Sequence, residues 1–175
     1  MLLSPLRKLT ENPKKILGPF VREGITVLEP GCAMGYFTLP LARMVGPEGK
    51  VIAVDIQPKM LARLEKRALK AGLIDRLDIR QADSEGLGIS DLEQSIDFCT
   101  LIHVVHEVPD QNRFFSDIAK ALKPGARLLV IEPRGHVSEE DFQASLSAAE
   151  EAGLQRISSA DVQGDRKALL ERVGN

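Results

Sequence analysis

The chain contains no tryptophan, a single tyrosine and only two cysteines among its 175 residues. Cys32 and Cys99 lie in segments that we expect to be buried or ligand-facing, so the sequence does not predict a disulfide framework. Two reduced thiols are typical of a protein from a reducing compartment. We therefore expect a cytoplasmic location.

Long apolar runs are also lacking. No stretch approaches the roughly 20 apolar residues of a membrane-spanning helix, and Met1–Lys8 lacks the longer apolar core of a signal peptide. Nor is there an excess of one charge, since 23 basic and 25 acidic residues leave a net charge of -2. We expect no membrane span and no nucleic-acid partner, because this balance provides no positive field for a polyanion.

The length suits one domain and is short for two. We expect residues 24–175 to form that domain. Residues 1–23 should form a flap or a short packing helix that begins at Asn12-Pro13. No pattern in the sequence indicates an oligomeric state.

Short apolar runs alternate with amphipathic segments from residue 24 onward. This alternation is typical of parallel strands joined by helical crossovers, and it predicts an α/β fold. The expected strands are Thr26–Glu29, Val51–Asp55, Leu77–Arg80, Ile96–Ile102, Arg127–Ile131, Leu154–Ser158 and Ala168–Arg172. Only Ser159–Lys167 connects the last two, without a helical period, so these two strands should pair as an antiparallel hairpin.

Helix boundaries are marked by proline, capping residues and glycine. The expected helices run from Pro58 to Gly72, from Asp110 to Leu122, and from the capping box Ser138-Glu-Glu-Asp141 to Gly153. Another helix should begin after residue 37. There, Thr38 is expected to act as the cap, which would place Pro40 in the first turn, where its missing N–H is not needed.

Residues 27–42 form the most informative segment. An apolar run ends at Glu29 and breaks into a turn that contains Gly31 and Gly35, after which a helical pattern begins. A second apolar run ends at Asp55, whose carboxylate would lie at a neighbouring strand tip. Together they predict a nucleotide-type binding corner. The alternatives are a purely structural loop and a helix-capping role for Asp55.

These segments resemble the class I S-adenosylmethionine-dependent methyltransferases, most closely the small ubiquinone/menaquinone-biosynthesis type. Glu29-Pro-Gly-Cys-Ala-Met-Gly35 is similar to the first family motif, an acid followed by three alternating glycines, with Ala33 in place of the middle glycine. The other matching positions are Asp55, Asp83, Ile96–Asp110 and Leu122–Glu132. Alanine permits close backbone approach but not every conformation with positive φ, so we expect a slightly altered loop.

The resemblance covers about residues 24–172. It implies a three-layer Rossmann-like methyltransferase fold, with a seven-stranded, mostly parallel sheet and an antiparallel last strand. It also implies S-adenosylmethionine as the cofactor and S-adenosylhomocysteine as the product. The cofactor-binding residues expected from it are Glu29, Gly31, Gly35, Asp55, Ile56, Asp83 and Leu101.

Each polar group of such a cofactor needs a partner. Glu29 would hold the ammonium of the methionine moiety, directly or through water, and Asp55 would accept from both ribose hydroxyls. Ile56 would cover one adenine face, while Asp83 would accept from the exocyclic amine. The backbone near Leu101 would face the methionine end. For Asp83, the alternative is a cap on a short helix within residues 84–92.

His103, His106 and Glu107 follow the fourth expected strand, at the edge where α/β sheets bind ligands. The two histidines are the candidate catalytic residues, since imidazole titrates near neutrality and can orient or deprotonate an acceptor. The alternative is that His106 and Glu107 only tie this loop to the next helix.

Three further side chains have two interpretations each. Glu132 and Arg134 follow the fifth expected strand, and they either bind the acceptor or pair with each other. Tyr36 either covers the methionine end or belongs to the core.

The predicted function is methyl transfer by in-line displacement to a small-molecule acceptor, whose reacting atom the sequence does not identify. One alternative is an NAD(P)-dependent oxidoreductase, since Asp55 suits a nicotinamide cofactor's ribose, although the G-x-G-x-x-G spacing is missing. Another is a non-catalytic protein that binds S-adenosylmethionine or S-adenosylhomocysteine. No His/Cys cluster has metal-ligand spacing, so no metal is expected.

Overall fold

The computed structural model describes residues 11–174, so residues 1–10 of the expected N-terminal segment and Asn175 lie outside the described residues. The described chain forms a seven-stranded sheet in the order β3-β2-β1-β4-β5-β7-β6. Its strands are β1 Thr26–Pro30, β2 Lys50–Asp55, β3 Leu77–Gln81, β4 Ile96–Ile102, β5 Leu122–Ile131, β6 Leu154–Ile157 and β7 Lys167–Arg172. The first five run parallel, and β7 pairs antiparallel with both β5 and β6.

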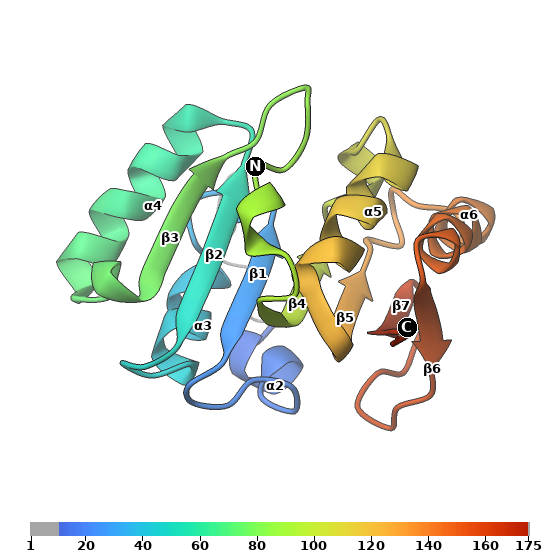
Figure 1. The fold of residues 1–175 in the computed structure, drawn as a ribbon, viewed down its shortest axis with the longest axis horizontal. Helices are drawn as coiled ribbons and strands as arrows, with labels where there is room; N and C mark the ends of the chain where they lie inside the picture. Colours follow the sequence, from blue (N-terminus) through green and yellow to red (C-terminus); the bar gives the residue numbers. More distant parts are fainter. Residues whose placement is uncertain (1–10, 175) are drawn as a thin grey trace.

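Helices separate most of the strands. The α-helices are α2 Pro13–Leu17, α3 Thr38–Met44, α4 Pro58–Ala71, α5 Gln111–Ala121 and α6 Glu139–Glu151, and the short 3-10 helices are η1 Ile74–Arg76, η2 Ser90–Leu92 and η3 Val105–Glu107. Figure 1 shows α4 beside β3 at one end of the sheet and α6 with the β6–β7 hairpin at the other. The predicted α/β class, the seven strands and the antiparallel last strand are confirmed.

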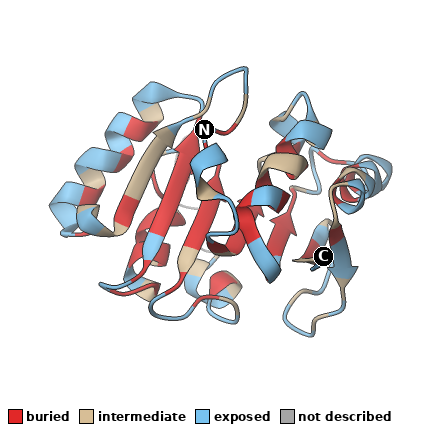
Figure 2. Cartoon of the chain, viewed as in Figure 1, coloured by how far each residue is buried: buried red, intermediate tan, exposed pale blue. Residues whose placement is uncertain are grey.

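Two apolar cores lie on opposite faces of the sheet and make a three-layer arrangement. One core contains Phe114 and Phe115 of α5 and Phe142 of α6. The other contains Leu17 of α2 and Leu64 of α4, together with residues of α3. Figure 2 shows the central strands buried and the outward surfaces of the helices exposed. Burial on both faces explains why the central strands are almost continuously apolar in sequence.

The local helix signals agree with the structure in most places. Asn12 caps α2 by accepting from the Lys14 amide at 3.0 Å. α4 begins at Pro58, and Gly72 follows it in the left-handed conformation. Asp110 and Ser138 cap α5 and α6 through their side chains.

The expected cap at Thr38 is wrong. Phe37 occupies the N-cap position of α3, and Thr38 is the first helical residue. The Thr38 hydroxyl instead donates to Glu29 Oε2 at 2.6 Å. The Thr38 hydroxyl, which the local sequence assigned to the helix end, is thus hydrogen-bonded to the buried Glu29 on β1.

The fifth strand begins earlier than expected. Leu122 pairs with Ile96, and Arg127 pairs with Phe98, so four residues of β5 face the single residue Asp97 of β4. Such a bulge keeps a strand in the sheet where the sequence, with Pro124-Gly125, indicates a break. The strand therefore starts at Leu122 rather than at Arg127.

Strand order fixes the place of a ligand site. β1 lies between β2 and β4, so the connections leaving β1 and β4 run to opposite sides. Ligands bind open α/β sheets at such a reversal, beyond the carboxyl ends of the strands.

Candidate functional site

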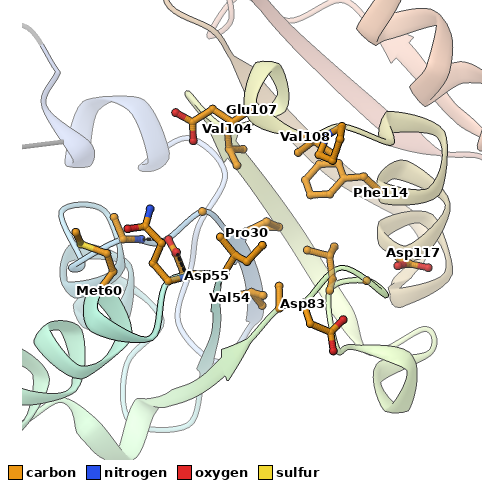
Figure 3. Close-up of a pocket in the computed structure, with 18 of the residues that line it drawn as sticks. Pro30, Val54, Asp55, Met60, Asp83, Val104, Glu107, Val108, Phe114 and Asp117 are labelled. Atoms are coloured by element: carbon orange, nitrogen blue, oxygen red, sulfur yellow. Dashed lines mark hydrogen bonds between the residues drawn. The ribbon is translucent and has the colours of Figure 1, made fainter.

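A cavity of about 500 Å³ opens beyond the carboxyl ends of β1, β2 and β4. Figure 3 shows Asp55 and Met60 on one side of it, and Val108 and Phe114 on the opposite side. Asp83 lies at its lower margin in this view. The volume and the mixture of apolar walls with a few carboxylates are typical of a small-molecule site.

The turn after β1 forms one wall and requires glycine at two positions. Gly31 and Gly35 have φ angles of 72° and 89°. A Cβ atom would lie 2.6 Å from Val104 Cγ2 at Gly31 and 2.5 Å from Leu64 Cδ1 at Gly35. The turn therefore packs against both the segment after β4 and helix α4, and a side chain at either glycine would separate them.

Asp55 holds this turn from the tip of β2. Its Oδ2 accepts from the Ala33 amide and its Oδ1 from the Gln57 amide, each at 2.8 Å. Ala33, which replaces the middle glycine of the motif, has a φ angle of 47° and so stays left-handed despite its Cβ. Asp55 is buried and lines the cavity, so the same carboxylate positions the loop and faces a ligand.

Two more expected cofactor residues line the cavity. Ile56 is 61% exposed, which is unusual for isoleucine and leaves an apolar surface beside the pocket. Asp83 Oδ1 accepts from the Glu85 amide at 2.7 Å, and Arg113 of α5 donates to the Glu85 carbonyl. Asp83 does not cap a helix, because residues 83–86 form a tight turn before the 3-10 helix η2.

Glu29 does not line the large cavity. It is 5% exposed and, with Thr38, lies beside a separate cavity of about 40 Å³. Burial raises the pKa of Glu29 to about 8; the Thr38 hydrogen bond opposes this shift and the Asp55 charge adds to it. A carboxyl group with this pKa is mainly protonated at neutral pH.

The segment after β4 forms the opposite wall. Leu101 is fully buried in the core, whereas Ile102, His103 and Val104 line the cavity. His103 has a φ angle of 59°, and its amide donates to the Ile131 carbonyl at 2.8 Å. This left-handed conformation is uncommon outside glycine, and it is held here by the neighbouring strand β5.

His103 also contacts the N-terminal segment. Its Nε2 lies 3.1 Å from Glu11 Oε1, and the Tyr36 hydroxyl donates to the Glu11 carbonyl at 2.8 Å. Tyr36 lines the cavity as well as packing edge-on against Phe37. Sequence reasoning missed Glu11, because nothing in the segment around Asn12-Pro13 links it to the residues after the fourth strand.

Glu132 organises the second histidine. Its Oε1 accepts from the amides of Val104 and Val105, at 3.1 and 3.0 Å, and its Oε2 contacts His106 Nδ1. His106 is not among the residues that line the large cavity. Glu132 and His106 thus fix the loop that presents His103 and Val104.

Glu132 and Arg134 do not pair with each other. Arg134 lies 3.5 Å from Asp165 and is well exposed, whereas the Glu132 side chain is 1% exposed. Glu107, in contrast, lines the cavity.

Apolar lining residues were also missed. Met34 lines the cavity from the turn, Met60 from α4, Val108 from the end of η3 and Phe114 from the first turn of α5. Apolar side chains at helical spacing are expected in any core, so the sequence offers no sign that these face a ligand. Among residues 11–174, no cluster of three His, Cys, Asp or Glu side chains is arranged to hold a metal ion.

Comparison with known families gives a match over nearly the whole described chain. A family described as "Methyltransferase domain" matches residues 22–174.

Curated relatives and solved structures agree with this match. "Ubiquinone/menaquinone biosynthesis C-methyltransferase UbiE" from Hahella chejuensis is 34% identical over 112 residues, which is 64% of this chain and 44% of that protein. The matched part thus spans less than half the length of that relative. A "SAM dependent methyltransferase from Aquifex aeolicus" is 25% identical with a TM-score of 0.83, over 97% of this chain and 94% of the other.

A more distant structure supports the fold alone. The "SAM-dependent O-methyltransferase (TM0748) from Thermotoga maritima" is 23% identical with a TM-score of 0.69, covering 100% of this chain and 68% of the other.

Proposed function

The chain belongs to the methyltransferase domain family, as a class I S-adenosylmethionine-dependent methyltransferase, and from this premise we propose that it methylates a small-molecule acceptor. The observation that carries the proposal is one cavity with Asp55 and Asp83 on its wall. It lies beside the turn that needs glycine at positions 31 and 35. Carboxylates at two strand tips suit the hydroxyls and amine of a nucleoside. When bound, the cofactor supplies an activated methyl group.

The chain's own residues account for binding such a cofactor. Asp55 keeps lone pairs beyond those used by Ala33 and Gln57, and these would accept from the ribose hydroxyls. Ile56 would lie against the adenine face, and Asp83 would accept from its amine. Below the loop, Glu29 would receive the ammonium of the methionine moiety, and its carboxyl would lose its proton when that cation arrives.

Positioning and proton transfer would come from the wall after β4. His103 lines the cavity and would accept a proton from an acceptor that carries one. His106 contacts Glu132 instead, which favours a positioning role for His106. In-line transfer depends mainly on alignment and on excluding water, and Val104, Val108 and Phe114 supply apolar contacts for both.

The same apolar side chains indicate a small, largely apolar acceptor. The Hahella relative is named as a C-methyltransferase, and we extend carbon methylation to this chain as part of the proposal. The comparisons do not favour the oxidoreductase or the non-catalytic binder.

We also propose a cytoplasmic location. Cys32 and Cys99 are free and buried, and burial raises the pKa of both thiols, so each is an unreactive packing group. Among the described residues, no helix is long and apolar enough to cross a membrane.

Calorimetric titration with S-adenosylmethionine, S-adenosylhomocysteine and NAD tests the proposal. We expect both sulfur nucleosides to bind, NAD not to bind, and Asp55→Ala to lose the binding. Asp78→Ala is the matched control, since Asp78 lies on the neighbouring strand β3 and pairs with Arg80 instead. Binding of NAD alone would contradict the cofactor assignment.

Transfer itself is measured by the appearance of S-adenosylhomocysteine with a panel of phenolic, enolic, amine and thiol acceptors. Turnover with a phenolic or enolic carbon acceptor is the expected result. Cofactor binding without turnover on any acceptor would favour the non-catalytic binder.

A further inference from the structure

A second, smaller cavity of about 40 Å³ lies beneath the turn after β1. Its lining includes Glu29 and Thr100 as well as Phe37. Pro30, Gly31, Ala33, Tyr36 and Ile102 line both this cavity and the large one. The small cavity is therefore an inner compartment behind the wall of the binding site.

Glu29 and Thr100 face this compartment from neighbouring strands. Val27 pairs with Phe98 and Leu28 with Cys99, so continuing the parallel register sets Glu29 beside Thr100. Side chains alternate along a strand, and Val27, Glu29, Phe98 and Thr100 therefore share one face of the sheet. Both Val27 and Phe98 belong to the core on that face.

Thr100 carries a polar atom without a partner. The residue is 1% exposed, and its Oγ1 has no hydrogen-bond partner among the described residues. Leaving a buried hydroxyl unpaired costs about 1–3 kcal/mol, and such groups usually bind an ordered water. A compartment of about 40 Å³ has room for one water, because a cavity of roughly 10–15 Å³ is enough to hold a water molecule.

The surroundings also suit a positive charge. The Glu29 carboxyl uses Oε2 to accept from Thr38, which leaves acceptor capacity on the same group. Tyr36 and Phe37 both line the compartment, and aromatic residues attract cations. Carboxyl, hydroxyl and aromatic groups thus converge on a water-sized space.

We propose that Thr100 and Glu29 hold one ordered water in this compartment, and that this water accepts a hydrogen bond from the amino group of the bound cofactor. Thr100 is then a positioning residue for the amino-acid end of the ligand, a role that no sequence motif indicated. The inference rests on the proposed function, because it assumes a ligand with a methionine-type tail.

Ligand truncation separates this role from a structural one. S-adenosylhomocysteine carries the amino-acid tail, whereas 5′-methylthioadenosine keeps the nucleoside and the sulfur but lacks that tail. Both are titrated calorimetrically into the wild-type protein, Thr100→Val and Thr100→Ser. Valine preserves the shape without the hydroxyl, and serine restores the hydroxyl as the matched control.

We expect Thr100→Val to weaken S-adenosylhomocysteine binding about five- to tenfold, to leave 5′-methylthioadenosine binding within about twofold, and Thr100→Ser to regain most of the loss. A Thr100→Val protein that binds S-adenosylhomocysteine as tightly as wild type overturns the inference. So does an equal loss for both ligands.

The wild-type titration keeps the two proposals apart. If wild-type protein binds neither ligand, the cofactor assignment itself is wrong and the inference falls with it. If wild-type protein binds both ligands and Thr100→Val shows no selective loss, only the role of Thr100 is wrong.

Discussion

The two walls of the large cavity are built differently. On the cofactor side, Asp55 is held by backbone amides of Ala33 and Gln57, which are 22 and 2 residues away in sequence. On the opposite side, His103 contacts the side chain of Glu11, and His106 contacts that of Glu132. Glu132 also accepts from the amides of Val104 and Val105. The contacts of Asp55 are thus to backbone donors alone, whereas the second wall combines backbone donors with particular side-chain pairs.

This difference separates two kinds of variation. A wall made from backbone amides tolerates substitution as long as the turn and one carboxylate remain. A wall made from side-chain pairs changes whenever either partner changes. We therefore expect the cofactor side to be sensitive at few positions, chiefly Asp55 and the two glycines, and the acceptor side to be sensitive at each member of its pairs.

The largest expected effect is the loss of the cofactor wall in Asp55→Ala. Two charge-assisted hydrogen bonds disappear and the amides of Ala33 and Gln57 lose their acceptor, so S-adenosylhomocysteine affinity should fall about a hundredfold. Hydrogen exchange should accelerate at the Ala33 amide and stay unchanged at Val104. Faster exchange at both amides would show that the two walls of the cavity do not respond independently to the substitution.

Glu132→Gln is the converse test on the acceptor wall. The amide keeps the size but has one accepting oxygen instead of two, so either the amides of Val104 and Val105 or the His106 nitrogen meets an NH2 group, and stability should fall by about 2–3 kcal/mol. Urea unfolding measures this loss, and exchange should now accelerate at Val104 but not at Ala33. The control is Glu171→Gln, an exposed partner of Arg127, with an expected change of less than about 1 kcal/mol.

The pH dependence of stability sharpens the comparison further, through Glu29. Its pKa is raised from 4.5 to about 8, so between these values the folded protein keeps a proton that the unfolded chain releases. The stabilisation is complete below pH 4.5 and is lost as pH rises through 8, with a limiting slope of about 1.4 kcal/mol per pH unit. Glu29→Gln removes this loss.

Urea unfolding of wild type and Glu29→Gln at pH 5, 7 and 9 measures the effect. The free energy of unfolding of the variant, relative to that of wild type, should increase as pH rises to about 8. Above that pH the difference should stay constant. Parallel stability curves would contradict a buried, protonated Glu29.

The smallest effect is expected at Ala33→Gly. Removing the Cβ relieves the left-handed strain at a φ of 47°, but it also frees the unfolded chain, and the two nearly cancel. The free energy of unfolding, measured by thermal unfolding, should change by less than about 1 kcal/mol. The affinity for S-adenosylhomocysteine should be equal or slightly higher. A destabilisation above about 1 kcal/mol would show that the loop uses the methyl group for packing.

The sequence predicted most reliably what is encoded locally. β4 has the expected bounds, and α4 begins at Pro58 and ends before Gly72, because proline, glycine and apolar spacing act within one segment. The turn with Gly31 and Gly35 is of the same kind. These features suffice to indicate the fold class and a nucleoside-type corner.

What the sequence did not predict depends on distant partners. Thr38 has the residue type of a cap, but Glu29 on a neighbouring element takes its hydroxyl. His103 was predicted as a site residue, whereas its partner Glu11 lies 92 positions away and no pattern joins them. The acceptor wall is assembled from such contacts, which explains why its details could not be read from local sequence.

One backbone hydrogen bond has a consequence for synthesis. The Glu132 amide donates to the Arg166 carbonyl at 2.8 Å, at the start of β7, which inserts between β5 and β6. A ribosome delivers Ala33, Asp55 and Gln57 early, but residue 166 emerges 109 residues after residue 57. The residues that hold the cofactor loop through Asp55 are therefore all synthesised well before the residue that accepts from the Glu132 amide.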